Sequence, residues 1–250
     1  MSNNILFRFS GSPHDVHEFQ WQPTHSNEFI TDTMRNARGC QNHSRFFNDM
    51  DFYMRLKNRE NTVKVELSGV RCRCSRYLFG ICSRYTVKLL DGSLHYEWAP
   101  SHFFEQGYYS YHGGERQELT LELREGEYIS GINIRQGEIL DGLALVTNQR
   151  TVQFGGSGGS FASMSPPEPT QRIIAFAGTA RGVMGRIGFF AEKISWEILG
   201  PLIMLRWLHE QNRATRSIPD TDCTQSQFAV WNLLNSSDDI FRRILCFLKP

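Results

Sequence analysis

Histidine and cysteine side chains near the start of the chain are of the types that bind metal ions. His14 and His17 stand three residues apart, and so do Cys40 and His43. Imidazole nitrogen and thiolate sulfur are the usual ligands of structural Zn²⁺. A long stretch without regular periodicity separates the two pairs. Polar loop histidines and one buried thiol explain the same residues, so we expect no metal site here.

A second group of thiols lies further along the chain, at Cys72, Cys74 and Cys82. Residues two apart on a strand face the same side, which would bring Cys72 and Cys74 together. Such a pair can bind a metal or carry redox chemistry, but free cysteines more often pack as small apolar side chains. Six cysteines in 250 residues are too few for a disulfide scaffold. We expect core packing or an exposed thiol.

The glycine-rich run from Gly155 to Gly159 surrounds Ser157 and comes near the Gly-x-Ser-x-Gly pattern of hydrolases. That pattern needs a helix after the serine, whereas Pro166 and Pro167 follow here. A phosphate-binding loop would need a closing Gly-Lys-Ser/Thr, which the run lacks. We therefore expect a glycine-rich β-turn, in a protein that is not an enzyme and uses no cofactor.

The charge balance excludes a protein dedicated to binding nucleic acid. The 27 Lys and Arg residues against 26 Asp and Glu give a net charge of +1, whereas a phosphate-backbone binder needs a strongly basic face. The first residues hold no apolar run of signal-peptide length. The longest apolar stretch, 194–208, includes Glu197 and Arg206 and is too polar to span a bilayer. These features favour a cytoplasmic protein.

Short runs of alternating apolar and polar residues dominate the middle of the chain. Alternation places every second side chain on one face of a sheet, and turn residues such as Asp91-Gly92 and Glu125-Gly126 separate the runs. The pattern predicts an all-β sandwich, barrel or prism. The predicted strands include residues 62–67, 85–89, 119–123, 129–134, 143–146, 150–154, 173–176 and 187–190.

The two ends of the chain differ from this middle. Residues 1–61 are aromatic and irregular, apart from an expected helix over 44–56. Residues 192–250 are helical in pattern, because Gly200-Pro201 precedes an apolar stripe and Ser236 to Asp239 can cap a last helix. We therefore expect three parts, namely an irregular extension (1–61), a β domain (62–191) and a helical extension (192–250).

Residues 107–191 resemble the jacalin-related lectin domain, including its zymogen-granule branch. The resemblance rests on the order and spacing of three segments. They are Gly113-Gly114 followed by a strand and Gly126-Glu127-Tyr128-Ile129, then Leu143 to Asn148 before the glycine-rich run, then Ile174 to Gly178 with Arg186-Ile187-Gly188-Phe189. The resemblance implies a β-prism of three four-stranded antiparallel sheets over residues 62–191, with sugar bound between loops at one apex.

In the family, backbone amides and one carboxylate bind the sugar hydroxyls. The resemblance places this site on residues 178–188, with a second loop over 135–138. Gly185 stands where the family has its aspartate, and the family's first glycine loop is not visible in the sequence. The loop thus keeps its donors and loses its acceptor. The expected ligand-binding residues are Gly178, Arg181, Gly182, Val183, Gly185, Arg135, Gln136 and Glu138.

Three arginines of these two segments, Arg135, Arg181 and Arg186, can form a small basic pocket. Arginine binds planar anions at two points, so the pocket favours a sulfated, phosphorylated or acidic ligand over a neutral hexose. These residues can equally shape exposed turns. The expected function is a jacalin-like lectin with a degenerate sugar site, whose partner is a carbohydrate or glycoprotein.

The last residues, 237–250, resemble the first helix of an F-box domain, the adaptor-binding module of ubiquitin ligases. A single short helix is marginal in water. It can pack on the β domain, mediate association, or belong to a longer adaptor. The alternative function is therefore a protein-interaction adaptor that uses the prism as a platform and residues 237–250 to dock a protein partner.

Overall fold

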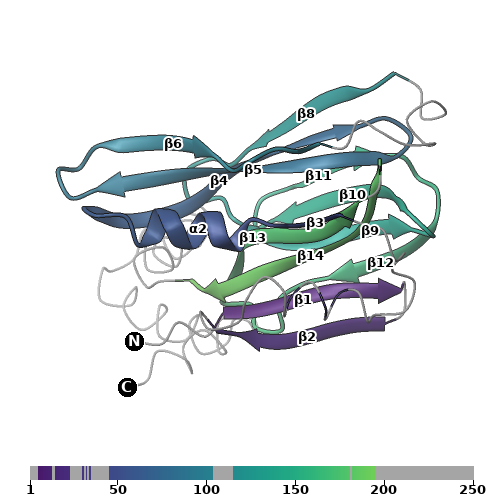
Figure 1. Cartoon of the computed structure of the whole chain (residues 1–250), viewed down its shortest axis with the longest axis horizontal. Coiled ribbons are helices and arrows are strands. Elements are labelled where there is room, and N and C mark those ends of the chain that lie inside the picture. Colours follow the sequence, from purple (N-terminus) through teal and green to yellow (C-terminus); the bar gives the residue numbers. More distant parts are fainter. Residues whose placement is uncertain are drawn as a thin grey trace, which may run out of the picture. The chain divides into compact units, whose positions relative to one another are not determined.

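The computed structural model describes residues 5–12, 15–22, 30, 32, 34, 45–103, 115–180 and 182–194. Strands in three antiparallel sheets dominate these residues and surround one apolar interior (Figure 1). This confirms the expected fold class, mainly β in a β-prism. The sheets are larger than the four strands each that the resemblance implies, because two of them hold five strands.

Sheet A brings the two ends of the described chain together. Its order is β2 (Asp15–Trp21), β1 (Ile5–Ser12), β14 (Met184–Lys193), β13 (Gln171–Ala180) and β3 (Arg45–Asn48). Strand β1 pairs with β14, with Phe9 opposite Gly188. Sheet A therefore closes only when strands from opposite ends of the sequence meet.

Sheets B and C are formed by consecutive parts of the chain. Sheet B has the order β6 (Leu94–Trp98), β5 (Leu78–Leu89), β4 (Thr62–Cys74) and β8 (Gln117–Glu122), and β7 (His102–Phe103) also pairs with β5. Sheet C has the order β11 (Thr151–Gly155), β10 (Leu140–Thr147), β9 (Ile129–Gln136) and β12 (Ser160–Met164).

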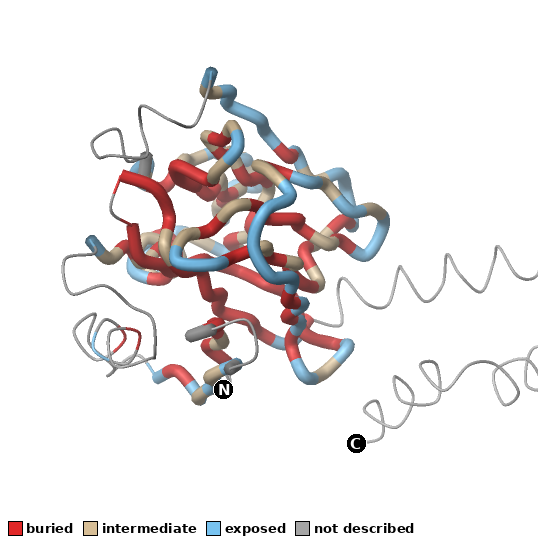
Figure 2. Tube along the Cα trace, turned by 90° about the vertical axis from the view of Figure 1, so that its right-hand side faces the viewer, coloured by how far each residue is buried: buried red, intermediate tan, exposed pale blue. Residues whose placement is uncertain are grey.

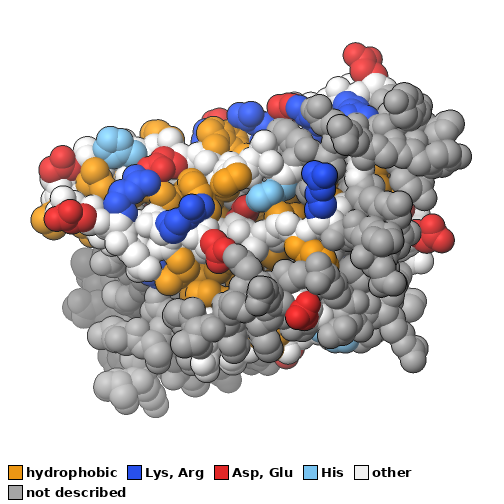
Figure 3. Space-filling model, in the orientation of Figure 1, with side chains coloured by type: hydrophobic (Ala, Val, Ile, Leu, Met, Phe, Trp, Pro, Cys, Tyr) orange, Lys and Arg blue, Asp and Glu red, His pale blue; other side chains and the backbone are white. Residues whose placement is uncertain are grey.

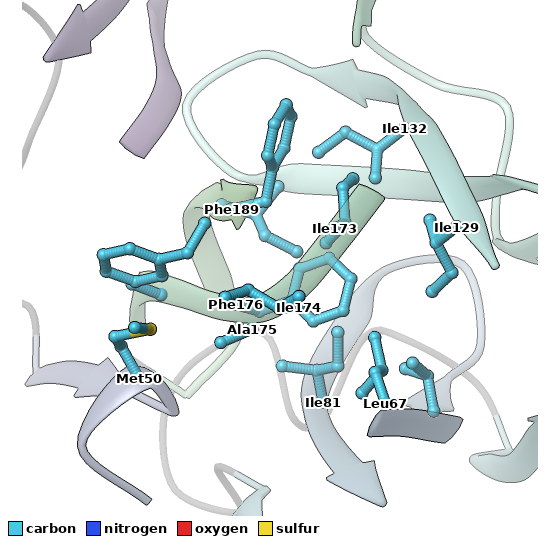
Figure 4. Packing of buried hydrophobic residues seen from close by; sticks show 14 of the residues in the cluster. Met50, Leu67, Ile81, Ile129, Ile132, Ile173, Ile174, Ala175, Phe176 and Phe189 are labelled. Atoms are coloured by element: carbon cyan, nitrogen blue, oxygen red, sulfur yellow. The ribbon is translucent and has the colours of Figure 1, made fainter. Parts of the chain in front are cut away.

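The interior of the prism takes side chains from all three sheets. Figure 4 shows Ile173 and Phe189 of sheet A near Ile132 of sheet C, with Leu67 and Ile81 of sheet B on the other side. Aliphatic and aromatic side chains of this kind contribute about 1.5–3 kcal/mol each when buried. This shared core is what holds the three sheets in one unit.

Strand β13 is buried along its whole length, unlike the strands of sheet B. Figure 2 shows buried segments in the interior of the molecule and exposed segments around its periphery. The sequence of β13, Gln171 to Ala180, is nearly all apolar after the first two residues and has no alternation, as expected for a strand covered on both faces. Helix α2 (Met50–Lys57) packs against β13 and β4. It buries Met50, Tyr53 and Leu56, which lie on one helical face.

The outer face of sheet B is a solvated surface of mixed charge. The guanidinium of Arg71 lies 4.2 Å from the centre of the Trp98 ring, and Arg84 donates a 2.9 Å hydrogen bond to Glu122. Figure 3 shows basic, acidic and hydrophobic side chains intermingled over this part of the molecule. The alternation that predicted these strands thus places charged residues outward and apolar residues inward.

Six of the eight predicted strand runs fall within observed strands, and the runs 119–123 and 150–154 each extend one residue beyond β8 and β11. The N-terminal stretch, however, differs from the expected irregular extension. Residues 1–61 contain β1, β2 and β3, all in sheet A, and the expected helix over 44–56 is confined to α2. Strand β1 is buried on both faces and so lacks alternation. In β2, His17, Phe19 and Trp21 share one side, and the imidazole of His17 stacks on Phe9.

Residues 1–193 form one compact unit, and residues 194–250 form another. The helices expected within 192–250 lie outside the described residues, as does the F-box-like segment 237–250. Among the residues that the structure describes, no helix has the length and apolar character needed to cross a membrane.

Candidate functional site

Several turns meet at one end of the prism, which we call the loop end. It comprises the β9–β10 turn (137–139), the β11–β12 loop (156–159) and the described part of the β13–β14 turn (182–183). Their strands enter and leave at the same side in the sheet registers and in Figure 1. The two segments expected to bind sugar, from sheets C and A, are therefore neighbours.

Arg186 joins these two segments. Its Nη1 donates hydrogen bonds to the carbonyl oxygens of Gly185 at 2.8 Å, Gly137 at 3.3 Å and Glu138 at 3.4 Å. The residue is only 5% exposed. A buried guanidinium whose donors face backbone carbonyls holds two turns together rather than offering a free face to an anion.

Gln136 forms a second connection between sheets C and A. Its side chain is fully buried, and Nε2 donates a 3.1 Å hydrogen bond to Ser10 Oγ of β1. Its position excludes direct contact of this side chain with a ligand at the surface. Gln136 therefore fixes the end of β9 against β1, a role that its sequence position alone did not indicate.

The glycines predicted to line the sugar site lie in different surroundings. Gly178 is inside β13, where a Cβ would come within 2.5 Å of the Phe47 ring and of the Arg186 carbonyl oxygen. Gly182 has a φ of 74°, a conformation that favours glycine. Val183 is buried, and Gly185 already belongs to β14. The turn is thus shorter than the expected loop over 178–188.

The remaining predicted residues lie around the β9–β10 turn or outside the described residues. Arg135 is half-buried at the end of β9, with its guanidinium 5.8 Å from the centre of the exposed Phe161 ring. Glu138 is exposed in the turn itself. Arg181 lies outside the described residues, so the basic pocket of three arginines remains a prediction.

Asp141 is a polar residue of the loop end that the sequence reasoning missed. It follows the β9–β10 turn, and its backbone oxygen accepts a 2.8 Å hydrogen bond from Gly156 N. Burial raises the pKa of its carboxyl group. The available signal was a single charge inside the apolar run from Ile139 to Val146.

Two of the three segments that carry the resemblance, Gly126 to Ile129 and Leu143 to Asn148, meet at the end of the prism opposite the loop end. Glu127 accepts hydrogen bonds from Arg150 Nε at 2.9 Å, Thr147 Oγ1 at 2.8 Å and Arg124 N at 3.0 Å. The side chain of Asn148 accepts a hydrogen bond from Tyr128 N and donates one to the carbonyl oxygen of Gly126. These residues form a clasp between the β8–β9 and β10–β11 connections, and their role is structural.

The cysteine and histidine motifs show no ligand geometry in the described part of the chain. Cys72 and Cys74 are buried, and burial raises the pKa of both thiols. Cys82 Sγ donates to the Ala99 carbonyl oxygen at 3.1 Å. Among the described residues no cluster of three His, Cys, Asp or Glu side chains could hold a metal ion. His14, Cys40 and His43 lie outside them.

A serine, an aspartate and a histidine do meet inside the molecule, but not in the order that catalysis requires. Ser83 Oγ donates to Asp49 Oδ2 at 2.5 Å, and His102 Nε2 lies 2.7 Å from Asp49 Oδ1. A serine nucleophile needs the histidine beside the hydroxyl, with the carboxylate behind it. Here the carboxylate stands between the two, and both Asp49 and Ser83 are fully buried.

Residues 94–190 match the family model described as the Jacalin-like lectin domain. The match includes all of sheet C, the β9–β10 turn and the β13–β14 turn. A search of curated protein sequences finds no match to the chain.

Solved structures of the same kind resemble the chain at low identity. A prostate-specific WGA16 glycoprotein lectin is 18% identical, over 62% of this chain and 95% of that one, with a TM-score of 0.44. A mannose-binding jacalin-related lectin from Ananas comosus is 20% identical, over 54% and 92%, with a TM-score of 0.39. A mannose-specific one from Morus nigra is 14% identical, over 60% and 87%, with a TM-score of 0.44.

Proposed function

We propose that this chain, whose residues 94–190 match the Jacalin-like lectin domain, is a non-enzymatic protein that binds carbohydrate at its loop end. One observation carries the proposal. The matched region contains both the β9–β10 and the β13–β14 turns, and Arg186 bonds one to the other. A fixed pair of turns can present backbone donors to sugar hydroxyls. We place the protein in the cytoplasm, as its sequence predicts.

A glycan array probed with the purified full-length chain tests this proposal. The array needs neutral, sulfated and phosphorylated sugars, because the ligand class is open. Binding to a defined group of glycans is the expected result. If the folded chain binds none of them, the carbohydrate-binding proposal is wrong.

A preference for anionic glycans is the finer part of the proposal. Arg186 is occupied by backbone carbonyls, so among the described residues the preference depends on Arg135 at the end of β9. The sulfated and phosphorylated members of the array should then bind more strongly than their neutral parents, and raised salt should reduce the difference. Equal binding of the two groups would limit recognition to hydroxyl contacts.

Gly185→Asp is a gain-of-function test of the β13–β14 turn. A Cβ at Gly185 would lie 3.0 Å from Thr179 Oγ1, so an aspartate fits after a small movement of that hydroxyl. The added carboxylate should strengthen binding of methyl α-D-mannopyranoside about tenfold, since charge-assisted hydrogen bonds are the strong ones. Gly185→Asn, with the same size and no charge, is the matched control. Equal affinity in both variants would contradict the assignment of this turn.

A further inference from the structure

The carboxylate of Asp141 lies close against two glycines at the loop end. A Cβ at Gly158 would lie 3.0 Å from its Oδ1, and a Cβ at Gly159 would lie 2.6 Å from its Oδ2. Gly159 also has a φ of 68°, in the region that favours glycine. The backbone of the β11–β12 loop therefore approaches this carboxylate as closely as it does because these two residues lack side chains.

The carboxylate of Asp141 is held in place but has no partner of its own. Its backbone oxygen is fixed by Gly156 N, and the residue is half-buried. Within the described part of the chain, no hydrogen bond or ion pair reaches the carboxylate oxygens Oδ1 and Oδ2. Burial raises the pKa of this carboxyl group. Removing a carboxylate partly from water costs free energy unless hydrogen-bond donors contact it.

The location of Asp141 makes it part of the loop end rather than an isolated surface acid. It is the second residue of β10, two positions beyond the β9–β10 turn. Arg186 donates hydrogen bonds to the Gly137 and Glu138 carbonyl oxygens of that turn. On the other side, a Cβ at Gly159 would lie 2.6 Å from the carbonyl carbon of Gln136. The carboxylate of Asp141 and the β13–β14 segment therefore both lie beside the β9–β10 turn. In the β13–β14 segment, Gly185 has no side chain that could accept a hydrogen bond.

We infer that Asp141 is the anionic acceptor of the glycan site, binding two adjacent hydroxyl groups of a hexose between the β9–β10 turn and the glycine-rich β11–β12 loop. This inference rests on the proposed function. An ionised carboxylate only accepts hydrogen bonds, and its two oxygens can take one hydroxyl each. A Ca²⁺ ion would need six to eight oxygen ligands, and the described residues hold no cluster of three acidic, histidine or cysteine side chains.

Calorimetric titration of the full-length chain with methyl α-D-mannopyranoside and methyl α-D-galactopyranoside tests the inference, together with any glycan found on the array. Asp141→Asn keeps the shape and removes the charge, so affinity should fall about tenfold or more. Asp91→Asn makes the same change in the exposed β5–β6 turn and is the matched control. Near-ultraviolet circular dichroism and thermal melting check that both variants fold.

A second variant tests access to the carboxylate without changing its charge. Gly158→Ala leaves Asp141 in the chain but places a methyl group against Oδ1, so binding should weaken by about threefold or more. Adding Gly185→Asp to Asp141→Asn should restore part of the lost affinity, because it returns a carboxylate to the neighbouring turn.

The possible results separate the inference from the function on which it rests. Loss of affinity in Asp141→Asn and Gly158→Ala, with Asp91→Asn unchanged, supports Asp141 as the acceptor. Wild-type affinity in Asp141→Asn would overturn the inference and leave the carbohydrate-binding proposal standing. A wild-type chain that binds no array glycan and neither hexoside would overturn both.

Discussion

Glu127 and Thr147 lie far from the loop end, although both stand in segments that resemble the lectin family. Burial by itself would raise the pKa of Glu127, but hydrogen bonds from Arg150, from the Arg124 N–H and from Thr147 hold that pKa at about 2. The motif residues of this region therefore stabilise the fold rather than bind sugar.

This clasp makes the protein's stability depend on pH in a defined direction. The pKa of Glu127 is lower in the folded than in the unfolded chain, so its stabilisation is complete above the ordinary carboxyl range. It is lost as the pH falls from that range to about 2. Glu127→Gln should therefore lower the free energy of unfolding by about 2 to 3 kcal/mol at pH 7.

Urea titrations of wild type and Glu127→Gln at pH 7 and near pH 2 provide the measurement. The difference between the two proteins should shrink at the lower pH, because about half of the wild-type carboxylate is then protonated. Glu125→Gln changes an exposed carboxylate in the same connection and should alter stability by less than about 0.5 kcal/mol. A gap that stays constant with pH would mean that Glu127 stabilises through shape alone.

At the scale of elements, the loop end depends on contacts between hairpins of different sheets. The β9–β10 turn is short and has its carbonyls bound by Arg186 of β14, while Gln136 anchors the preceding strand to β1. Hydrogen bonds from a charged donor contribute about 1.5–3 kcal/mol each. The geometry of one turn is thus set by a residue that lies about fifty positions away in the sequence.

Replacing Arg186 should loosen the β9–β10 turn without unfolding the sheets. We expect Arg186→Met to raise the amide hydrogen-exchange rates of residues 137–139 by about tenfold, because two backbone carbonyls of this turn lose their donor. Mass spectrometry of peptides covering this turn gives the readout. Arg135→Met, on the same hairpin, is the control. Unchanged exchange in Arg186→Met would show that the turn holds its own shape.

The elements that could be predicted from the sequence are those whose two faces differ. Strands β4 and β9 have alternating patterns because one face meets the core and the other meets water. Strand β1 is buried on both faces, so this signal is absent. Strand β12 carries Phe161 on its exposed side, which hides its alternation.

The candidate site was predictable only in part, for a related reason. The two segments 135–138 and 178–188 were found through family resemblance, and the structure does place their turns together. Asp141 was missed because its surroundings come from Gly158 and Gly159, on another hairpin. The roles of Gln136 and Arg186 also depend on partners remote in sequence, which local patterns do not reveal.

At the scale of the whole molecule, the prism extends beyond the expected β domain of residues 62–191. Sheet A takes three of its five strands from the first 48 residues. The ring of Phe7 lies 4.6 Å from that of Phe190, and both side chains are fully buried. Without these strands, the β13–β14 hairpin would expose apolar surface on its two edges.

A fragment comparison tests this extended boundary. A fragment of residues 62–191 should lack a cooperative unfolding transition in urea, because removing β1 and β2 takes Phe7 and Trp21 away from Phe190. A fragment of residues 1–193 should unfold cooperatively with a defined near-ultraviolet circular dichroism signal. If the shorter fragment unfolds at the same urea concentration as the longer one, the N-terminal strands are dispensable.

The pairing of β1 with β14 also has a consequence for how the protein is made. Strand β14 leaves the ribosome after all the other described strands, whereas β1 leaves it before them. Contacts between remote segments form slowly and leave apolar surface open in the meantime. The nascent β1–β2 hairpin, with Phe7 and Phe9 uncovered, must therefore wait for its partner. We expect this stage of synthesis, rather than the finished fold, to be where the chain most needs protection from aggregation.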